Sequence, residues 1–222
     1  MREAEAPWSP RGLVETIAAR GERPAILTLR GDRIETWTAA MLARRVRGAA
    51  RALSDQGVAA GDVVALHAAS GPDWIALGLA CGWIGAVLCP LDAALPPDEA
   101  AEVAAGLGAR LFVGDRAEGA PAALARPLAA LTAEAGQDAP APAERAPDAP
   151  IALFRTSGTT GAPKAFHLTA ANIGYVAQAV ATCGLLRADD RVLLPLPLHH
   201  VYPWITAALG SLTAGATLIL PE

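Results

Sequence analysis

The sequence predicts an α/β protein whose largely parallel sheets are flanked by helices. Short apolar segments of strand length alternate with longer segments in which apolar residues recur at helical spacing. Several strand segments are almost continuously apolar, as is usual in sheets that are covered on both faces. Hydrophobic residues make up 53% of the 222 residues, which is enough to fill a core and excludes general disorder.

The first 135 residues alternate helix and strand. In chain order, the expected elements are a helix at Pro10–Arg20, a hairpin of strands Ala25–Leu29 and Arg33–Trp37, a helix from the N-cap Thr38 to Gly57, strand Val63–His67, a helix up to Ile84, strand Ala86–Cys89, helix Asp98–Leu107 and strand Arg110–Val113. Periodicity supports the helix after Thr38, with Met41, Leu42, Val46 and Leu53 on its apolar face.

A change of composition separates this part from the rest. Residues 117–150 are rich in Ala and Pro, and 136–150 is expected to be a linker or surface loop. The elements expected after it are strand Ile151–Phe154, strand Ala165–Leu168, a helix from Thr169 to Leu186, and a strand, loop, helix and strand within Val192–Pro221. We therefore expect a first α/β subdomain at 1–135, the linker at 136–150 and the start of a second α/β subdomain at 151–222.

Charge and cysteine content argue against two classes of protein. The chain has 18 basic and 22 acidic residues and a net charge of −4, without the basic excess of a nucleic-acid binder. Cys81, Cys89 and Cys183 form no CxxC pair and no zinc-type cluster, so we expect reduced, buried thiols in a cytoplasmic protein. The first residues lack the apolar segment of a signal peptide.

Two uncharged stretches have the composition of membrane segments. Trp74–Leu91 holds 18 such residues, and Val192–Pro221 is longer. Both are interrupted by Gly and Pro, and the first has no Lys or Arg nearby to anchor it at a membrane surface. We therefore expect buried α/β core and no membrane span.

The segment Thr156–Lys164, with the sequence TSGTTGAPK, carries the clearest chemical signal. Four hydroxyls, two glycines and a terminal lysine follow a buried strand. Glycines let backbone N–H groups approach a ligand, hydroxyls add donors, and a lysine supplies a point charge for phosphate oxygens. The pattern is not a Walker A loop, because Pro163 precedes the lysine.

Lys164 is the only lysine among the 18 basic residues. A lysine in a chain that uses arginine at every other basic position indicates a requirement for a compact ammonium group. The alternative interpretation of the segment is a solvated Ser/Thr/Gly turn between two strands.

These residues resemble the phosphate-binding signature of the adenylate-forming superfamily, which includes acyl- and aryl-CoA synthetases, peptide-synthetase adenylation domains and luciferases. Two further segments resemble the family in order and spacing: Gly85–Asp92 (GAVLCPLD), and Pro197–Pro203 (PLHHVYP) followed by Gly215–Thr217. The resemblance spans nearly the whole chain and implies the N-terminal portion of the synthetase fold. The positions that depart from the family pattern are Arg155, Ala165, Ala170, His199 and Pro203.

The resemblance implies a two-step reaction. A carboxylic acid is activated with ATP and Mg²⁺ to an acyl-adenylate, and the thiol of coenzyme A or of a phosphopantetheine carrier protein then displaces AMP. It implies a catalytic role for Lys164 and nucleotide phosphate binding by the same lysine with Thr156, Ser157, Gly158, Thr159, Thr160 and Gly161. His200 is implied to line the acyl pocket, and the HHVYP variant resembles fatty-acyl synthetases. A hydrogen-bonded loop histidine is the alternative for His200, whereas His67 is expected to be a core or strand-end residue.

The adenine, ribose and metal segments of such enzymes, and their C-terminal catalytic lysine, would lie beyond residue 222. We therefore expect the fragment alone to be inactive and to self-associate through an exposed edge at Thr217–Leu220. The principal alternative is a nucleotide- or anion-binding module without catalysis. A membrane-associated lipid-handling protein is a third hypothesis, suggested by the two uncharged stretches.

Overall fold

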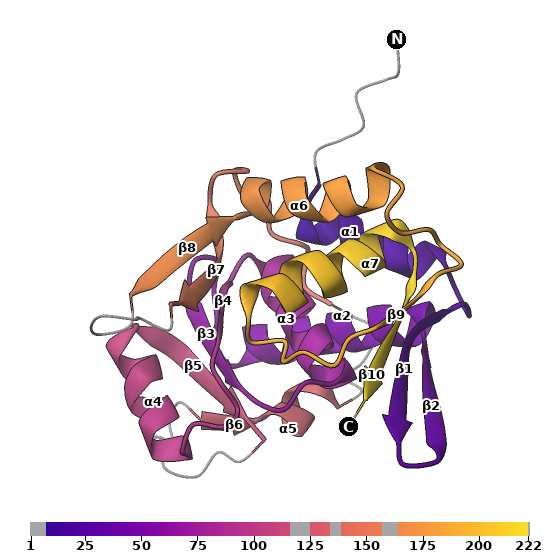
Figure 1. Cartoon of the computed structure of the whole chain (residues 1–222). Coiled ribbons are helices and arrows are strands. Elements are labelled where there is room, and N and C mark those ends of the chain that lie inside the picture. Colours follow the sequence, from indigo (N-terminus) through magenta and orange to yellow (C-terminus); the bar gives the residue numbers. More distant parts are fainter. Residues whose placement is uncertain (1–7, 116–124, 134–138, 157–163, 222) are drawn as a thin grey trace.

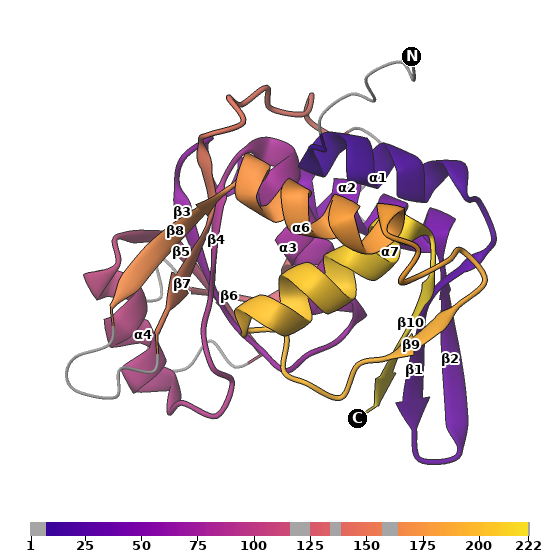
Figure 2. The same ribbon diagram turned by 45° about the horizontal axis from the view of Figure 1, so that its top comes forward.

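The computed structural model describes residues 8–115, 125–133, 139–156 and 164–221, and it confirms the α/β class. Two sheets lie on opposite sides of a layer of helices (Figure 1). The same arrangement is visible after rotation (Figure 2), with helix α4 on the outer side of the larger sheet. The predicted largely parallel sheets flanked by helices are therefore present.

The larger sheet, called sheet B, has six strands and carries the predicted phosphate loop. In spatial order these are β6 (Ala125–Pro127), β5 (Ala109–Gly114), β3 (Val63–His67), β4 (Val87–Pro90), β7 (Pro150–Arg155) and β8 (Ala165–Thr169). All neighbouring strands are parallel except the antiparallel pair β7 and β8. Both faces of the central strands are buried, which explains why their sequences are almost continuously apolar.

The smaller sheet, called sheet A, has four strands. In spatial order these are β2 (Arg33–Thr38), β1 (Pro24–Arg30), β10 (Thr217–Pro221) and β9 (Arg191–Leu193). Strand β10 pairs in parallel with β1 on one side and β9 on the other. The expectation of an exposed edge at Thr217–Leu220 is therefore wrong, because both edges of that strand are occupied.

The helices are α1 (Pro10–Ala19), α2 (Ala39–Asp55), α3 (Pro72–Ile84), α4 (Pro97–Gly106), α5 (Leu128–Thr132), α6 (Ala170–Thr182), the π-helix η1 (Tyr202–Leu209) and α7 (Gly210–Ala214). Thr38 caps α2 as predicted, and its hydroxyl accepts a hydrogen bond from the Met41 backbone. Thr169 forms a capping box with Asn172 at the start of α6. Helix α3 ends at Ile84 and is followed by the C-cap Gly85, whose φ of 75° suits glycine.

The main hydrophobic core lies between the two sheets. It joins Ile26 and Leu218 of sheet A to Val64 and Leu88 of sheet B through the intervening helices. A second cluster lies between sheet B and α4 and includes Cys89. No described helix has both the length and the apolar composition needed to cross a membrane.

Some sequence expectations need correction. Met41 is 37% exposed, so it lies at the border of the apolar face of α2 rather than within it. Cys183 is exposed, whereas Cys81 and Cys89 are buried as expected. Helix α6 ends at Thr182, short of the expected Leu186.

The predicted division into subdomains at 136–150 stays a prediction. Sheet A joins β1 and β2 to β9 and β10, and sheet B joins β3 to β7, so each sheet takes strands from both sides of that segment. The strand β6 and helix α5 lie in the Ala- and Pro-rich stretch before residue 136, for which the sequence predicted no particular element.

Candidate functional site

The carboxyl ends of the parallel strands of sheet B form the edge at which the phosphate loop begins. Strands β3 and β4 run parallel, and β7 runs parallel to β4, so their C-terminal ends lie at the same edge of the sheet. In α/β proteins this edge is where ligands usually bind. The predicted loop leaves β7 at Arg155 and returns through the antiparallel strand β8.

Hydrogen bonds between Thr156 and Lys164 close the base of this loop. The backbone N–H of Thr156 donates to the Lys164 carbonyl at 2.9 Å. The Thr156 hydroxyl accepts from the Lys164 backbone N–H at 3.2 Å and lies 3.4 Å from the Lys164 carbonyl oxygen. The two ends of the loop are thus held together, and the hydroxyl of Thr156 is engaged in that contact.

The lysine side chain is left accessible by this arrangement. Lys164 is exposed, and its closure contacts use only its backbone. Ser157, Gly158, Thr159, Thr160 and Gly161 lie outside the described residues. Their contacts with a phosphate, like that of Lys164, stay predictions.

Arg155 places a second cationic side chain at the base of the loop. It is half-buried, and its positive charge acts to lower the pKa of the Cys89 thiol on the neighbouring strand. Burial raises the pKa of Cys89 to about 12, and Arg155 opposes that rise only in part. Cys89 is therefore a neutral core thiol and not a nucleophile.

The segment with the two histidines is fixed to the same edge of sheet B. The backbone N–H of Leu198 donates to the Ser70 hydroxyl, just beyond β3, at 2.9 Å. His199 Nε2 lies 3.7 Å from Asp92 Oδ1, just beyond β4, and the side chain of His199 is only 12% exposed. The structure therefore brings the second and third resemblance segments together at the ends of adjacent strands.

His199 is a neighbour of both Asp92 and His200. Burial lowers the pKa of His199, the adjacent His200 lowers it further, and the Asp92 carboxylate opposes both effects. The two histidine rings are 4.1 Å apart. His199 thus favours the neutral form near pH 7, in which its ring can both donate and accept hydrogen bonds.

His200 itself is exposed at the start of the turn into η1. Its carbonyl accepts from the Trp204 backbone N–H at 3.2 Å. Among the described residues, no hydrogen bond or ion pair joins His200 to Lys164. The acyl-pocket role of His200 stays a prediction.

A surface cleft of about 300 Å³ lies beside the histidine segment. It is bounded by the chain beyond β3 and β4, the chain after β9 and the end of β10. Its walls are Ala68, Ser70, Asp92, Ala93, Ala94, Leu194, Pro195, Leu196, Pro197, His199, Leu220 and Pro221. The cleft is mainly apolar with a few polar groups, which is the usual composition of a small-molecule site.

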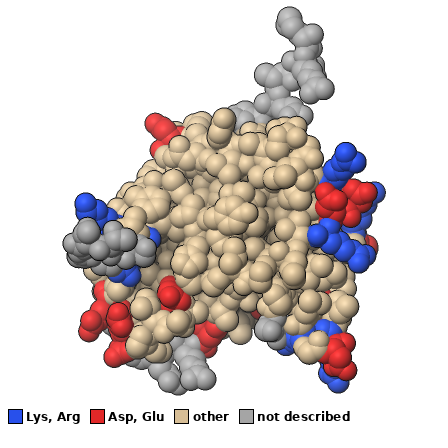
Figure 3. Space-filling view, viewed as in Figure 1, with Lys and Arg blue, Asp and Glu red and all other residues tan. Residues whose placement is uncertain are grey.

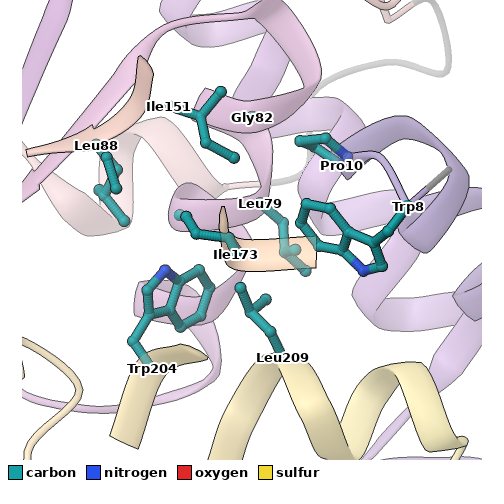
Figure 4. A pocket seen from close by; sticks show the side chains of 11 residues that line it. Trp8, Pro10, Leu79, Gly82, Leu88, Ile151, Ile173, Trp204 and Leu209 are labelled. Carbon is teal, nitrogen blue, oxygen red and sulfur yellow. The ribbon is translucent and has the colours of Figure 1, made fainter. Parts of the chain in front are cut away.

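A second hollow, between α3, β4, α6 and η1, has the wrong size for a substrate. The side chains of Leu79, Leu88, Ile173, Trp204 and Leu209 converge on it (Figure 4). Its volume of about 20 Å³ is that of a single water molecule, and its walls are apolar. It is a packing defect and not a binding site.

His67 has a structural role near this edge. His67 Nε2 lies 3.1 Å from the Leu95 carbonyl, and its ring stacks on Phe112, so the strand-end interpretation of His67 is confirmed.

Within the described ranges, no three His, Cys, Asp or Glu side chains are grouped to hold a metal ion.

Comparison with known proteins identifies the family. The family model described as "AMP-binding enzyme" matches residues 13–222. The chain belongs to the AMP-binding enzyme family. The resemblance inferred from the three sequence segments is thereby confirmed.

Individual members of the AMP-binding family show how much of such a protein this chain represents. The chain is similar to feruloyl-CoA synthase of Amycolatopsis sp, with 34% identity over 82% of this chain and 38% of the relative. It is similar to indoleacetate–CoA ligase of Aromatoleum aromaticum, with 32% identity over 82% of this chain and 39% of the relative. It therefore spans less than half the length of these relatives.

A solved AMP-binding structure shows the same fold. The N-terminal subdomain of Klebsiella oxytoca NpsA, in complex with 3-hydroxybenzoyl-AMSN, matches with a TM-score of 0.82 and 22% identity. The match covers 97% of this chain and 54% of that one. The present fold is thus the first part of the N-terminal subdomain of adenylate-forming enzymes.

Three residues at this edge were absent from the site predicted from the sequence: Ser70, Asp92 and His199. The sequence did offer one indication for His199: it departs from the family pattern and stands next to His200. Nothing local in the sequence links it to Asp92 or Ser70. These contacts depend on the packing of the histidine segment against the ends of β3 and β4.

Proposed function

We propose that this chain is the N-terminal portion of an AMP-forming acid–thiol ligase. In the first step, a carboxylate oxygen attacks the α-phosphorus of ATP, and pyrophosphate leaves. In the second, a thiol sulfur attacks the acyl carbonyl carbon, and AMP leaves. The thiol belongs to coenzyme A or to the phosphopantetheine of a carrier protein, and we place the reaction in the cytoplasm.

One observation carries this proposal more than any other. The TSGTTGAPK segment is closed at its base by Thr156 and Lys164, at the carboxyl edge of sheet B, in a chain of the AMP-binding family. Closure by the backbone of Lys164 leaves its ammonium group available for phosphate oxygens. A preorganised cation and loop donors would stabilise the charge that develops as pyrophosphate leaves.

The substrate in this proposal is a carboxylic acid that fits the cleft beside His199 and His200. The expectation of a fatty acid finds no support in the names of the relatives, which specify ferulate, indoleacetate, 4-coumarate, oxalate and sulfoacetate. Three of these five acids carry an aromatic ring, and none is a long aliphatic acid. We therefore propose an aromatic acid ahead of a long aliphatic one.

Magnesium accompanies ATP in this proposal, but the described residues supply no grouped ligands for it. No step is therefore assigned to the metal through this chain. The binding of nucleotide phosphate and the placing of the acid are the roles proposed for its residues.

The test is carboxylate-dependent exchange between ATP and pyrophosphate. It is to be measured in a polypeptide that joins this region to the segments that follow it in its relatives, with ferulate, indoleacetate and a long-chain fatty acid as substrates. Exchange that needs an aromatic acid supports the proposal in full. ATP binding without exchange for any acid would favour the non-catalytic nucleotide-binding module instead.

A further inference from the structure

Strand β2 forms an outer edge of sheet A and has no described strand beyond it. It pairs with β1 along Arg33–Thr38 and is the outermost strand in both ribbon views (Figures 1 and 2). The four residues Arg33, Ile34, Glu35 and Thr36 are all exposed. A strand edge of this kind presents unpaired backbone N–H and C=O groups that can pair with another strand.

Along this edge, an apolar side chain stands between a positive and a negative one, a pattern that is complementary to a second, antiparallel copy of itself. Ile34, the second residue of β2, is 66% exposed and lies opposite Leu29 of β1, so an apolar side chain stands on this edge near the hairpin turn. A positive Arg33 and a negative Glu35 flank it. Neither forms an ion pair with another described residue. In space-filling view, charged side chains of both signs gather over the β1–β2 hairpin (Figure 3).

We propose that β2 is a dimerisation edge that pairs antiparallel with β2 of a second copy of this chain. A two-fold axis at Ile34 places Arg33 opposite Glu35 of the second copy and Glu35 opposite its Arg33. The two Ile34 side chains meet at the axis. The pairing extends sheet A from four strands to eight across the dimer.

The charges select this register over its neighbours. A shift that places the axis at Arg33 sets two guanidinium groups opposite each other, and an axis at Glu35 sets two carboxylates opposite each other. Like charges in directly opposed positions are destabilising, whereas opposite charges stabilise a sheet. The register centred on Ile34 is the one in which both cross-strand charge pairs are favourable.

The other described edges fit a second copy less well. Strands β9, β6 and β8 carry no pair of opposite charges to fix a register. Strand β2 carries such a pair in Arg33 and Glu35. Because few residues take part, the dimer should dissociate on dilution.

The test is a charge swap within the full 222-residue chain. Sedimentation velocity of the wild-type protein over a range of concentrations should show a reversible dimer. Glu35→Arg alone and Arg33→Glu alone should each raise the dimer dissociation constant by about tenfold or more, because both copies then present like charges. The double variant, Arg33→Glu with Glu35→Arg, should return it close to the wild-type value.

Arg191→Glu is the matched control, because Arg191 is an exposed arginine on β9, the opposite edge strand of the same sheet. It should leave the dissociation constant unchanged. Hydrogen exchange of the wild-type chain gives a measurement that needs no variant: amides of residues 33–36 should become more protected as the concentration rises. A wild-type monomer at all concentrations, a dimer insensitive to both single reversals, a double variant as weak as the single ones, or unchanged exchange at 33–36 would each overturn the proposal.

Discussion

Thr156 and Lys164 have different roles at the base of the phosphate loop. The hydroxyl of Thr156 is bonded to the backbone of Lys164, so its role in the described structure is to hold the two ends of the loop together. The lysine contributes its backbone to that closure and keeps its side chain exposed. A substitution at Lys164 should therefore affect a ligand without affecting the hairpin.

We expect Lys164→Ala to weaken ATP binding by about 10- to 100-fold, from loss of a charge-assisted contact of roughly 1.5–3 kcal/mol. The free energy of unfolding should be unchanged, because the side chain is exposed. Calorimetric titration with ATP and thermal unfolding measure the two effects. Arg23→Ala is the control, since it removes an exposed cation near sheet A instead. Equal ATP affinity in wild type and Lys164→Ala would remove the phosphate role.

The cysteines give a second prediction at the residue scale. Burial raises the pKa of Cys81 and of Cys89 to about 12, while Cys183 is exposed. A thiol reagent at pH 8 should therefore label only Cys183 rapidly in the folded chain, and all three in denaturant. Mass spectrometry of the labelled protein gives the count. Rapid native labelling of Cys81 or Cys89 would contradict their burial.

Because of these two thiols, the free energy of unfolding should depend on pH in the alkaline range. Their folded pKa is higher than the unfolded value of about 9, so the unfolded chain loses these protons first. Stability from this source is complete below pH 9 and is lost as the pH rises from 9 toward 12.

At the carboxyl edge of sheet B, the contact between His199 and Asp92 was not predicted, because the two residues are far apart in sequence.

At the scale of elements, the sequence predicts best where an apolar run has clear ends. The uncharged stretch Trp74–Leu91 was divided correctly into helix and strand, since Gly85 suits a helix terminus and Pro90 a strand end. Elements of three to five residues, β6 and α5, were missed in the region rich in Ala and Pro. Such short elements are held by the sheet and helices around them, so periodicity in the sequence cannot reveal them.

Close packing of α3 on α1 gives a prediction at this scale. A Cβ placed at Gly82 would lie 2.7 Å from the Cβ of Pro10, the rigid first residue of α1. Gly82→Ala should therefore lower the free energy of unfolding by about 1–3 kcal/mol, despite the higher helix propensity of Ala.

Gly106→Ala is the matched control for this change. Gly106 is also helical, but its added Cβ would meet nothing within 4 Å, so that variant should be neutral or up to about 1 kcal/mol more stable. Chemical denaturation of both variants measures the difference. A Gly82→Ala protein as stable as Gly106→Ala would mean that α1 moves away from α3 without cost.

For the whole molecule, the decisive feature is that both sheets share one core. Ile26 of β1 and Leu218 of β10 belong to the same buried cluster as Val64 of β3 and Phe154 of β7. In sheet A, β10 separates β1 from β9 and supplies the parallel partner of β1. The first 135 residues therefore contain β1 and β2 but lack the strand that joins this hairpin to the sheet.

The predicted first subdomain can be tested directly on this basis. Residues 1–135 expressed alone should lack a cooperative thermal transition, because β1 loses β10, β4 loses β7, and the core loses Trp204, which packs edge-to-face on Trp74 at 4.9 Å. Small domains with an intact core unfold in one cooperative step, so its absence reports a core that cannot close. Co-expression of 1–138 with 139–222 is the control, since it supplies every described strand and leaves out only one covalent link. The pair should copurify and unfold in a single transition. If 1–135 instead unfolds cooperatively by itself, the division at 136–150 is a real domain boundary, and the core between the sheets contributes less to stability than its extent implies.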